Sequence, residues 1–278
     1  MRKFYSSLKY ICIIALAVSM IALVAVVAYV LINGVDKLSI DLLFGDYKNS
    51  PSILPAFIGT LQLVGISAVI AVPIGIASAI FLVEYTNNKG RFVKIVQVAT
   101  ETLAGIPSIV YGLFGYLIFV VAFGWGYSII GGGITLAIMI LPTIVRSTQE
   151  SLLSVQGGLR EGAYALGTSK VRTIFKIVLP SAAGGIVTAI ILAIGRVVSE
   201  SAVLILTIGM VVNKVPETLM APGTSLALDI YYFASHGYPD EAAATAVVLL
   251  VFVLALNLLA GWVGKMIKKS TYGDSAKA

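Results

Sequence analysis

The chain has 278 residues, of which 59% are hydrophobic and 12% are charged, and its mean hydropathy is +1.00. No soluble globular domain has that balance, so the composition indicates a membrane protein. Cys12, the only cysteine, lies in an apolar run, and His236 is the only histidine. A disulfide framework is therefore excluded, and we expect neither a cysteine metal site nor a metal site at the lone histidine.

Six apolar runs divide the chain, and we predict that they form six transmembrane helices in one all-α domain, 1–278. The first run could be a signal peptide, but its 23 residues exceed a typical signal sequence core and no small-x-small cleavage site follows it. Pro107 is expected to kink or begin the third helix, with Ser108 free to satisfy a released backbone group. No repeat and no second domain are evident. The predicted spans are 10–32, 56–83, 102–123, 129–145, 181–210 and 242–264.

The basic residues are distributed unequally between the two sets of polar segments. The N-terminal segment, the 84–94 turn, the 146–176 loop and the tail hold fifteen of the 19 Lys and Arg residues, whereas the opposite loops hold three. This bias predicts that both termini are cytoplasmic. It also explains the net charge of +6, so nucleic-acid binding is the poorer account. The fifteen are Arg2, Lys3, Lys9, Lys89, Arg91, Lys94, Arg146, Arg160, Lys170, Arg172, Lys176, Lys265, Lys268, Lys269 and Lys277, and the three are Lys37, Lys48 and Lys214.

A long polar interval, 152–180, separates the fourth and fifth apolar runs on the basic side. Gly157-Gly158 is expected to end the preceding helix. Leu159, Ala163 and Leu166 fall at i, i+4 and i+7, which predicts one face of a short amphipathic helix. That helix could dock in a groove of a partner, or it could lie on lipid headgroups. Its basic anchors would then be Arg160, Lys170, Arg172 and Lys176.

Glycine and proline predict the turns within the same interval. Gly167 is a suitable helix stop, and Thr168 or Ser169 can cap a second short helix. Pro180 suits the first turn of the next membrane helix, where its missing N–H costs nothing.

Arg196 and Glu200 interrupt the fifth apolar run four residues apart. A charge in hydrocarbon costs at least about 2.5 kcal/mol, so both are expected to face protein or a water-filled cavity. At this spacing the pair can neutralise each other on one helix face. Because the guanidinium donates two parallel hydrogen bonds and stays charged, Arg196 suits an oxyanion on a permeation path. The alternative is a structural pair that fixes helix packing between subunits.

Other polar residues have two interpretations each. Glu101, just before the third run, is structural or part of a gate near the cytoplasmic interface. Asp229, Tyr231 and His236 lie on the outer side, where a binding protein could dock, or belong to a solvated loop.

The spacing within 152–180 resembles the EAA loop of ABC-importer permeases, in which E-A-A is followed by three residues, Gly, nine residues and I-x-L-P. One position departs, because Gly162 stands where the pattern has its first Ala, which weakens the helix turn by about 1 kcal/mol. The resemblance implies that 152–180 is a cytoplasmic dock for an ATPase. The matching residues are Glu161, Gly162, Ala163, Gly167, Leu179 and Pro180.

The whole chain resembles the PstA family, permease subunits of the phosphate-specific ABC importer. The motif G-R-x-x-x-E-S-A includes Arg196, Ser199, Glu200 and Ser201, which the resemblance places on the substrate path; Ser201 stands where the family more often has Thr, and the sister permease PstC stays possible. Further matching stretches are 58–61, 72–75, 82–85, 103–115, 136–144, 160–170 and 223–235.

The resemblance implies a type I (MetI-like) permease fold and phosphate import driven by a partner. Those partners would be a PstC-like permease, two copies of a PstB-like ATPase and a PstS-like extracytoplasmic binding protein. The chain lacks a G-x-x-x-x-G-K-[ST] loop, so we expect no bound nucleotide or cofactor and no catalysis.

Two rival functions are open at this point. The same dock would serve a permease for sulfate, molybdate or another solute. A gradient-driven secondary transporter would be expected to have inverted repeats and several membrane carboxylates. This chain has one Arg–Glu pair and no visible repeat, so that rival is weaker.

Overall fold

The computed structural model describes residues 2–45, 47, 51–86 and 90–272, and within them all regular secondary structure is helical. Lys48, Lys89 and Lys277 of the charge comparison lie outside the described residues. The α-helices are α1 (Arg2–Gly34), α2 (Ile40–Phe44), α3 (Leu54–Ile80), α4 (Arg91–Ala104), α5 (Ser108–Gly115), α6 (Ile129–Leu153), α7 (Gly157–Ala165), α8 (Lys170–Thr173), α9 (Leu179–Val198), α10 (Ala202–Thr207), α11 (Leu226–Ser235) and α12 (Pro239–Tyr272). Val35–Lys37 forms a 3₁₀ turn, and π-helical turns are found at Phe81–Tyr85, Tyr116–Ala122 and Ile174–Val178.

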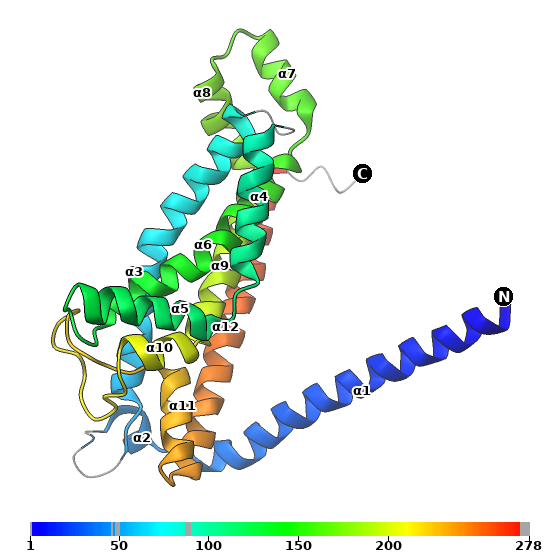
Figure 1. Cartoon of the computed structure of the whole chain (residues 1–278). Coiled ribbons are helices and arrows are strands. Elements are labelled where there is room, and N and C mark those ends of the chain that lie inside the picture. Colours follow the sequence, from blue (N-terminus) through cyan, green and yellow to red (C-terminus); the bar gives the residue numbers. More distant parts are fainter. Residues whose placement is uncertain (1, 46, 48–50, 87–89, 273–278) are drawn as a thin grey trace.

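The described helices include five that are long and apolar enough to cross a membrane, or six if the bent pair α4–α5 counts as one span. The bundle is elongated, with α7 and α8 at one end and α2 and the start of α12 at the other (Figure 1). The five single spans are Lys9–Lys37, Leu54–Tyr85, Ile129–Leu153, Lys170–Val198 and Pro239–Met266.

Helix α6 forms the centre of the bundle and packs against α3, α4, α5 and α9. Of its most apolar 18-residue window, 67% is buried inside the chain, against 28% for α3. Gly133 brings the α6 backbone close to Ile66 of α3, where a Cβ would lie 2.6 Å from the Ile66 side chain. Because lipid tails are as apolar as leucine, such close packing of small residues is what holds membrane helices together.

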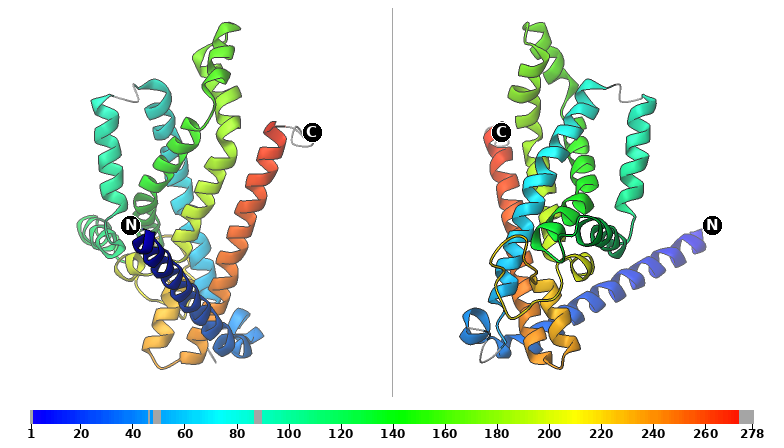
Figure 2. Two further views of the ribbon diagram at one scale, coloured as in Figure 1. Left: turned by 90° about the vertical axis from the view of Figure 1, so that its right-hand side faces the viewer. Right: turned by 60° about the vertical axis from the view of Figure 1, so that its left-hand side comes forward.

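Helix α1 leaves the bundle and stands apart from it in Figure 1 and in the right-hand view of Figure 2. It joins α12 at its C-terminal end, where a Cβ on Gly34 would lie 2.4 Å from the Ala243 carbonyl oxygen. None of its apolar window is buried within the chain. This helix must therefore be covered by lipid or by another subunit.

The third predicted span is a broken helix. The axes of α4 and of α5 with its π-helical extension meet at 95°, and Pro107 precedes the first residue of α5. The Tyr111 hydroxyl donates to the Leu103 carbonyl oxygen across the bend, at 2.8 Å. The side chain that satisfies a backbone group at the bend is therefore Tyr111 and not Ser108, for which the sequence prediction was wrong.

The fifth predicted span, 181–210, is also interrupted. Helix α9 ends at Val198, and the short helix α10 begins at Ala202. The residues between them include two serines, which compete for backbone hydrogen bonds and therefore favour helix ends. Hydropathy could not detect this break because both sides of it are apolar.

Candidate functional site

The break between α9 and α10 lies partway along the bundle, between the α7 end and the opposite end (Figure 1). Ser199 is the C-cap of α9, and its hydroxyl donates to the Gly195 carbonyl oxygen at 3.0 Å. Ser201 precedes α10, and its carbonyl oxygen accepts from the Leu204 amide at 3.0 Å. The two hydroxyls and the backbone groups at the break form a polar interval inside an apolar segment.

Arg196 lies in the last turn of α9, and its side chain is exposed on the surface of the chain. The predicted i,i+4 pair with Glu200 is absent from the ion pairs of the described residues, and this prediction was wrong. Glu200 follows the end of the helix, so the two residues do not share a helix face. The Glu200 carboxylate instead accepts from the Val203 amide at 3.3 Å, at the start of α10.

The Arg196 guanidinium has no ion-pair or hydrogen-bond partner in the described part of the chain, although it lies close enough to Tyr111 for an electrostatic interaction. An uncompensated cation in hydrocarbon costs at least about 2.5 kcal/mol. The face that carries Arg196 therefore cannot meet lipid tails, and it must face a second subunit or water.

Helix α5 supports the break from its other side. A Cβ on Gly112 would lie 3.0 Å from the Val203 Cα atom, and a Cβ on Gly115 would lie 2.3 Å from the Thr135 hydroxyl of α6. The two broken spans therefore meet backbone to backbone, α5 against α10, with α6 beneath. A substitution at either glycine would move the break that positions Arg196.

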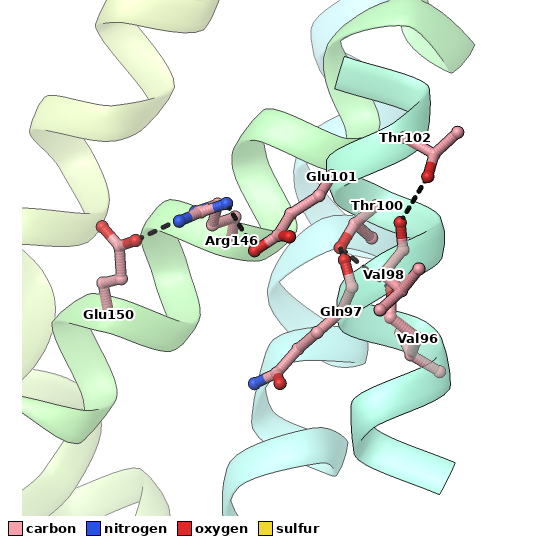
Figure 3. A network of polar contacts seen from close by, with 8 residues as sticks. All are labelled: Val96, Gln97, Val98, Thr100, Glu101, Thr102, Arg146 and Glu150. Atoms are coloured by element: carbon pink, nitrogen blue, oxygen red, sulfur yellow. Dashed lines mark hydrogen bonds and ion pairs between the residues drawn. The ribbon is translucent and has the colours of Figure 1, made fainter. Parts of the chain in front are cut away.

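Glu101 belongs to a polar network between α4 and α6 (Figure 3). Arg146 Nη1 donates to Glu101 Oε1 at 3.0 Å, and its Nε donates to Glu150 Oε1 at 3.1 Å. A cavity of about 190 Å³ is lined by these residues together with Gln97 and Gln149. The three charged side chains are each more than half exposed, so the network is open to solvent or a partner.

The loop between α6 and α9 projects from the bundle as α7 and α8 (Figure 1). Gly167 follows α7 with φ of +78°, and its amide donates to the Tyr164 carbonyl oxygen at 2.9 Å. The Ser169 hydroxyl accepts from the Arg172 amide and caps α8, as one of the two predicted caps. Pro180 lies in the first turn of α9, but α9 continues from α8 through the π-helical turn Ile174–Val178. The membrane helix therefore begins at Lys170, and the prediction that it begins at Pro180 was wrong.

The apolar face predicted for α7 is not a single buried face. Ala163 is buried, but Leu159 is 40% exposed and Leu166 is 89% exposed. Leu166 lies beyond the end of α7, so the helical spacing does not extend to it. Exposed apolar side chains next to the exposed Glu161 give this end of the molecule a mixed surface that a protein partner can cover.

One buried ion pair was missed at the sequence level. Arg160 of α7 contacts Glu84 of the π-helical turn after α3, with Nη2–Oε1 at 2.8 Å, and the two side chains are 19% and 6% exposed. Removing one partner of a buried pair costs about 3–5 kcal/mol, whereas exposed pairs contribute about 0–1 kcal/mol. The pair could not be predicted because its residues are 76 positions apart in the sequence, and Arg160 by itself was interpreted as a possible lipid anchor.

Asp229 of α11 is fully buried, so the prediction that it meets a binding protein or solvent was wrong. Its Oδ1 accepts from the Thr224 hydroxyl, and its Oδ2 has no partner among the described residues. Burial raises the pKa of Asp229 to about 8, against the opposing effect of the Thr224 hydrogen bond. Tyr231 and His236 are exposed on the same helix end, and their proposed contact with a partner stays a prediction.

The raised pKa of Asp229 predicts a pH-dependent stability. Because an unfolded Asp titrates near pH 4, the folded chain binds the extra proton between about pH 4 and pH 8, so stability falls as pH rises through that range. Asp229→Asn should remove this contribution, so the fall in apparent melting temperature of the solubilised protein from pH 5 to pH 8 should be smaller in the variant than in the parent. Scanning fluorimetry checks it, with Asp36→Asn, an exposed carboxylate, as control; equal pH slopes in all three proteins would contradict the prediction.

The fold is that of membrane permease subunits of ABC transport systems. Residues 71–271 match the family described as the binding-protein-dependent transport system inner membrane component. Since the match covers most of the chain, the chain belongs to that family.

The chain is also similar to individual permease proteins over most of its length. The chain is 35% identical over 268 residues to the probable ABC transporter permease protein YqgI of Bacillus subtilis, covering 89% of this chain and 90% of that one. It is 34% identical to the phosphate transport system permease protein PstA of Haemophilus influenzae, with 81% of each chain covered. It is 36% identical to PstA 1 of Mycobacterium tuberculosis (strain ATCC 25618 / H37Rv), covering 75% of this chain and 68% of that one.

Solved structures share the fold at low sequence identity. A bacterial alginate ABC transporter in complex with its alginate-bound periplasmic protein aligns with a TM-score of 0.70 at 16% identity, covering 94% of this chain and 95% of that one. The inward-facing MetNI methionine ABC transporter aligns with a TM-score of 0.60 at 17% identity, covering 77% of this chain and 94% of that one.

Proposed function

We propose that this chain is the permease subunit through which inorganic phosphate enters the cell, driven by ATP hydrolysis on a partner. Relatives named as phosphate transport permeases support the solute class. The observation that carries the proposal is the Arg196 guanidinium, which is exposed beside a helix break and has no ion-pair or hydrogen-bond partner among the described residues. A fixed cation with a two-pronged donor set suits a tetrahedral oxyanion.

Each residue at the break has a proposed part in the passage. Arg196 binds the anion through its guanidinium. The Ser201 hydroxyl donates to it further along the path, as does the Ser199 hydroxyl once it has turned away from the Gly195 carbonyl oxygen. Glu200, held by the Val203 amide, keeps a negative charge near the bound anion and so limits how long it stays. Passage requires binding that is strong enough for entry and weak enough for release.

The α7 end is proposed as the dock for the ATPase. Glu161 and Gly162 would face the partner from α7, Ala163 would hold α7 against the bundle, Gly167 would set the turn, and Leu179 and Pro180 would lie in the membrane helix that follows. ATP is hydrolysed on that partner, and this chain has no catalytic role. The proposed assembly has a PstC-like permease, a PstB-like ATPase dimer and a PstS-like extracytoplasmic binding protein.

The same assignment gives an orientation in the plasma membrane. The segments rich in Lys and Arg, including α7, α8 and both termini, would lie in the cytoplasm. Helix α12 ends on the side of the bundle on which α7 lies, which is compatible with this orientation (Figures 1 and 2). The domain 1–278 is then one membrane permease unit.

Uptake of labelled phosphate at low external concentration tests the proposal. Cells without their own importer would carry this chain together with its neighbouring transporter genes. We expect saturable uptake that arsenate inhibits and that excess sulfate or molybdate leaves unchanged. Uptake displaced by sulfate or molybdate would assign another oxyanion to the same site.

The driving force is tested in the same cells. Removal of the ATPase at an intact proton gradient should abolish uptake. Continued uptake without the ATPase would favour a gradient-driven transporter and overturn the proposed function.

A further inference from the structure

We propose that Arg160 and Glu84 are positioning residues that carry the movement of the docking helix α7 into the membrane helix α3. This inference rests on the proposed function, because it assumes that a partner ATPase moves α7. The pair would set how much transport each hydrolysed ATP produces. It takes no part in binding the solute.

The Arg160 guanidinium joins three segments of the chain at once. Its Nε and Nη2 donate to Glu84 Oε1 at 3.1 and 2.8 Å, beyond the end of α3. Nη2 also donates to the Leu152 carbonyl oxygen in the last turn of α6, at 2.9 Å, and Nη1 donates to the Val155 carbonyl oxygen at 3.0 Å. A cation on the last carbonyls of a helix is favoured by the helix dipole. Such a planar, multiply bonded group resists displacement more than one hydrogen bond does.

Helix α7 has few other attachments to the bundle. Ala163 is its one buried residue, and all residues of α7 are described. Added Cβ atoms on Gly157, Gly158 and Gly162 would meet nothing within 4 Å. A force applied to α7 therefore reaches the bundle through Arg160, through Ala163, and through α8 with the π-helical turn Ile174–Val178 that follows it.

A second contact from the same loop reaches the residue next to Glu84, in the turn that follows α3. The Lys170 ammonium lies 4.8 Å from the centre of the Tyr85 ring, at the start of α8. Two cations from the docking loop thus contact consecutive residues, Glu84 and Tyr85. Both belong to the π-helical turn Phe81–Tyr85, and π-helical turns are common at functional sites.

Helix α3 extends the connection to the other end of the bundle. The span Leu54–Tyr85 covers 32 residues, and near its start a Cβ on Gly59 would lie 2.1 Å from the Thr224 carbonyl oxygen. Between these ends, Leu63 and Ala71 share a buried cluster with Val197 of α9. Displacing Glu84 would therefore move a helix that is packed at both ends and against the helix that carries Arg196.

The test uses a reporter cysteine in the assembled transporter, and it does not depend on knowing the solute. Cys12 is the only cysteine, so Cys12→Ser gives a cysteine-free chain into which Leu61→Cys, on an exposed position of α3, introduces one label site. ATP with vanadate would trap the ATPase closed. We expect trapping to change the labelling rate of the cysteine at position 61. We expect Arg160→Gln or Glu84→Gln to abolish that change while the ATPase still co-purifies.

Coupling is measured in proteoliposomes as phosphate transported per ATP hydrolysed. Either single variant should lower this ratio by at least about tenfold, because it breaks the ion pair that links α7 to the end of α3. Combining Glu84→Gln with Arg160→Gln should cause no further loss, since the two residues act as one unit. The exposed cross-helix pair Lys37–Asp240 is the matched control, and Lys37→Gln with Asp240→Asn should leave the ratio unchanged.

Several results would overturn the inference. One is that Arg160→Gln transports as much phosphate per ATP as the parent. A second is that vanadate trapping changes the labelling rate at position 61 equally in Arg160→Gln and the parent. A third is that trapping does not change the labelling rate in the parent. If the Gln variants fail to assemble, the milder variants Arg160→Lys and Glu84→Asp are measured in their place. An assembled complex that transports less phosphate per ATP supports the inference. Uptake that falls only in proportion to the amount of assembled complex refutes it. Failure of the proposed function looks different, because the parent complex would then transport no phosphate even if position 61 responds to trapping.

Discussion

Arg196→Gln should reduce phosphate uptake by at least about 100-fold while the transporter still assembles. Hydrogen bonds to charged groups contribute about 1.5–3 kcal/mol each, and a bidentate guanidinium loses two of them to the anion when Gln replaces it. Because the guanidinium has no protein partner in the described part of the chain, its loss leaves no buried charge behind. Uptake of labelled phosphate, with membrane abundance measured on the same cells, gives the result.

A variant that keeps the positive charge at position 196 shows how much of the effect on uptake comes from the shape of the guanidinium and how much from its charge. Arg196→Lys keeps the cation but lacks the planar fork, so uptake should lie between those of the parent and Arg196→Gln. Lys214→Gln, at an exposed cation paired with Glu217, is the control for loss of one positive charge. Unchanged uptake in Arg196→Gln would assign the residue to subunit packing.

Gly167→Val should uncouple the ATPase from transport while leaving the chain in the membrane. Gly167 has φ of +78°, a left-handed conformation that costs residues with a side chain about 1–2 kcal/mol, and more for a β-branched residue. A Cβ there would meet nothing within 4 Å, so the effect comes from the backbone and not from a clash. The altered turn would misplace α7 relative to α8, and uptake should fall by about 5–30-fold.

Gly237 offers a matched control for this strain. It has φ of +85° and equally open space, and it lies at the opposite end of the bundle, between α11 and α12. Gly237→Val should cost similar stability but leave the ATPase coupled. Equal loss of uptake in the two variants would mean that general destabilisation, and not docking, explains Gly167→Val.

The loop between α6 and α9 shows which structural features can be predicted from neighbouring residues in the sequence. Its helix stop at Gly167 and its cap at Ser169 were predictable because each depends on backbone conformation within a few residues. The exposure of Leu159 and Leu166 was not predictable, since helical spacing shows which residues share a face but not which face packs against the bundle. Arg160 was identified as a cation, but its partner Glu84 is 76 residues away.

The Arg–Glu interval in the fifth run shows a different limit. Four-residue spacing predicts a pair only if the helix continues, and here it ends at Val198. Because the residues on both sides of the break are apolar, a hydropathy profile does not detect that the helix ends there. Similarly, Asp229 stands in a polar-looking loop sequence, yet α11 packs it entirely inside the bundle.

The sequence by itself determined that this chain is an all-helical membrane protein, where most of its spans lie and which loop resembles an ATPase dock. Those properties follow from local composition, because a bilayer selects long apolar helices and turns depend on neighbouring residues. Only the tertiary structure decided that two spans are broken, that Arg196 stands without Glu200, and that Glu84 and Asp229 are buried. These depend on which distant segments pack together, and burial and ion pairing are properties of that packing.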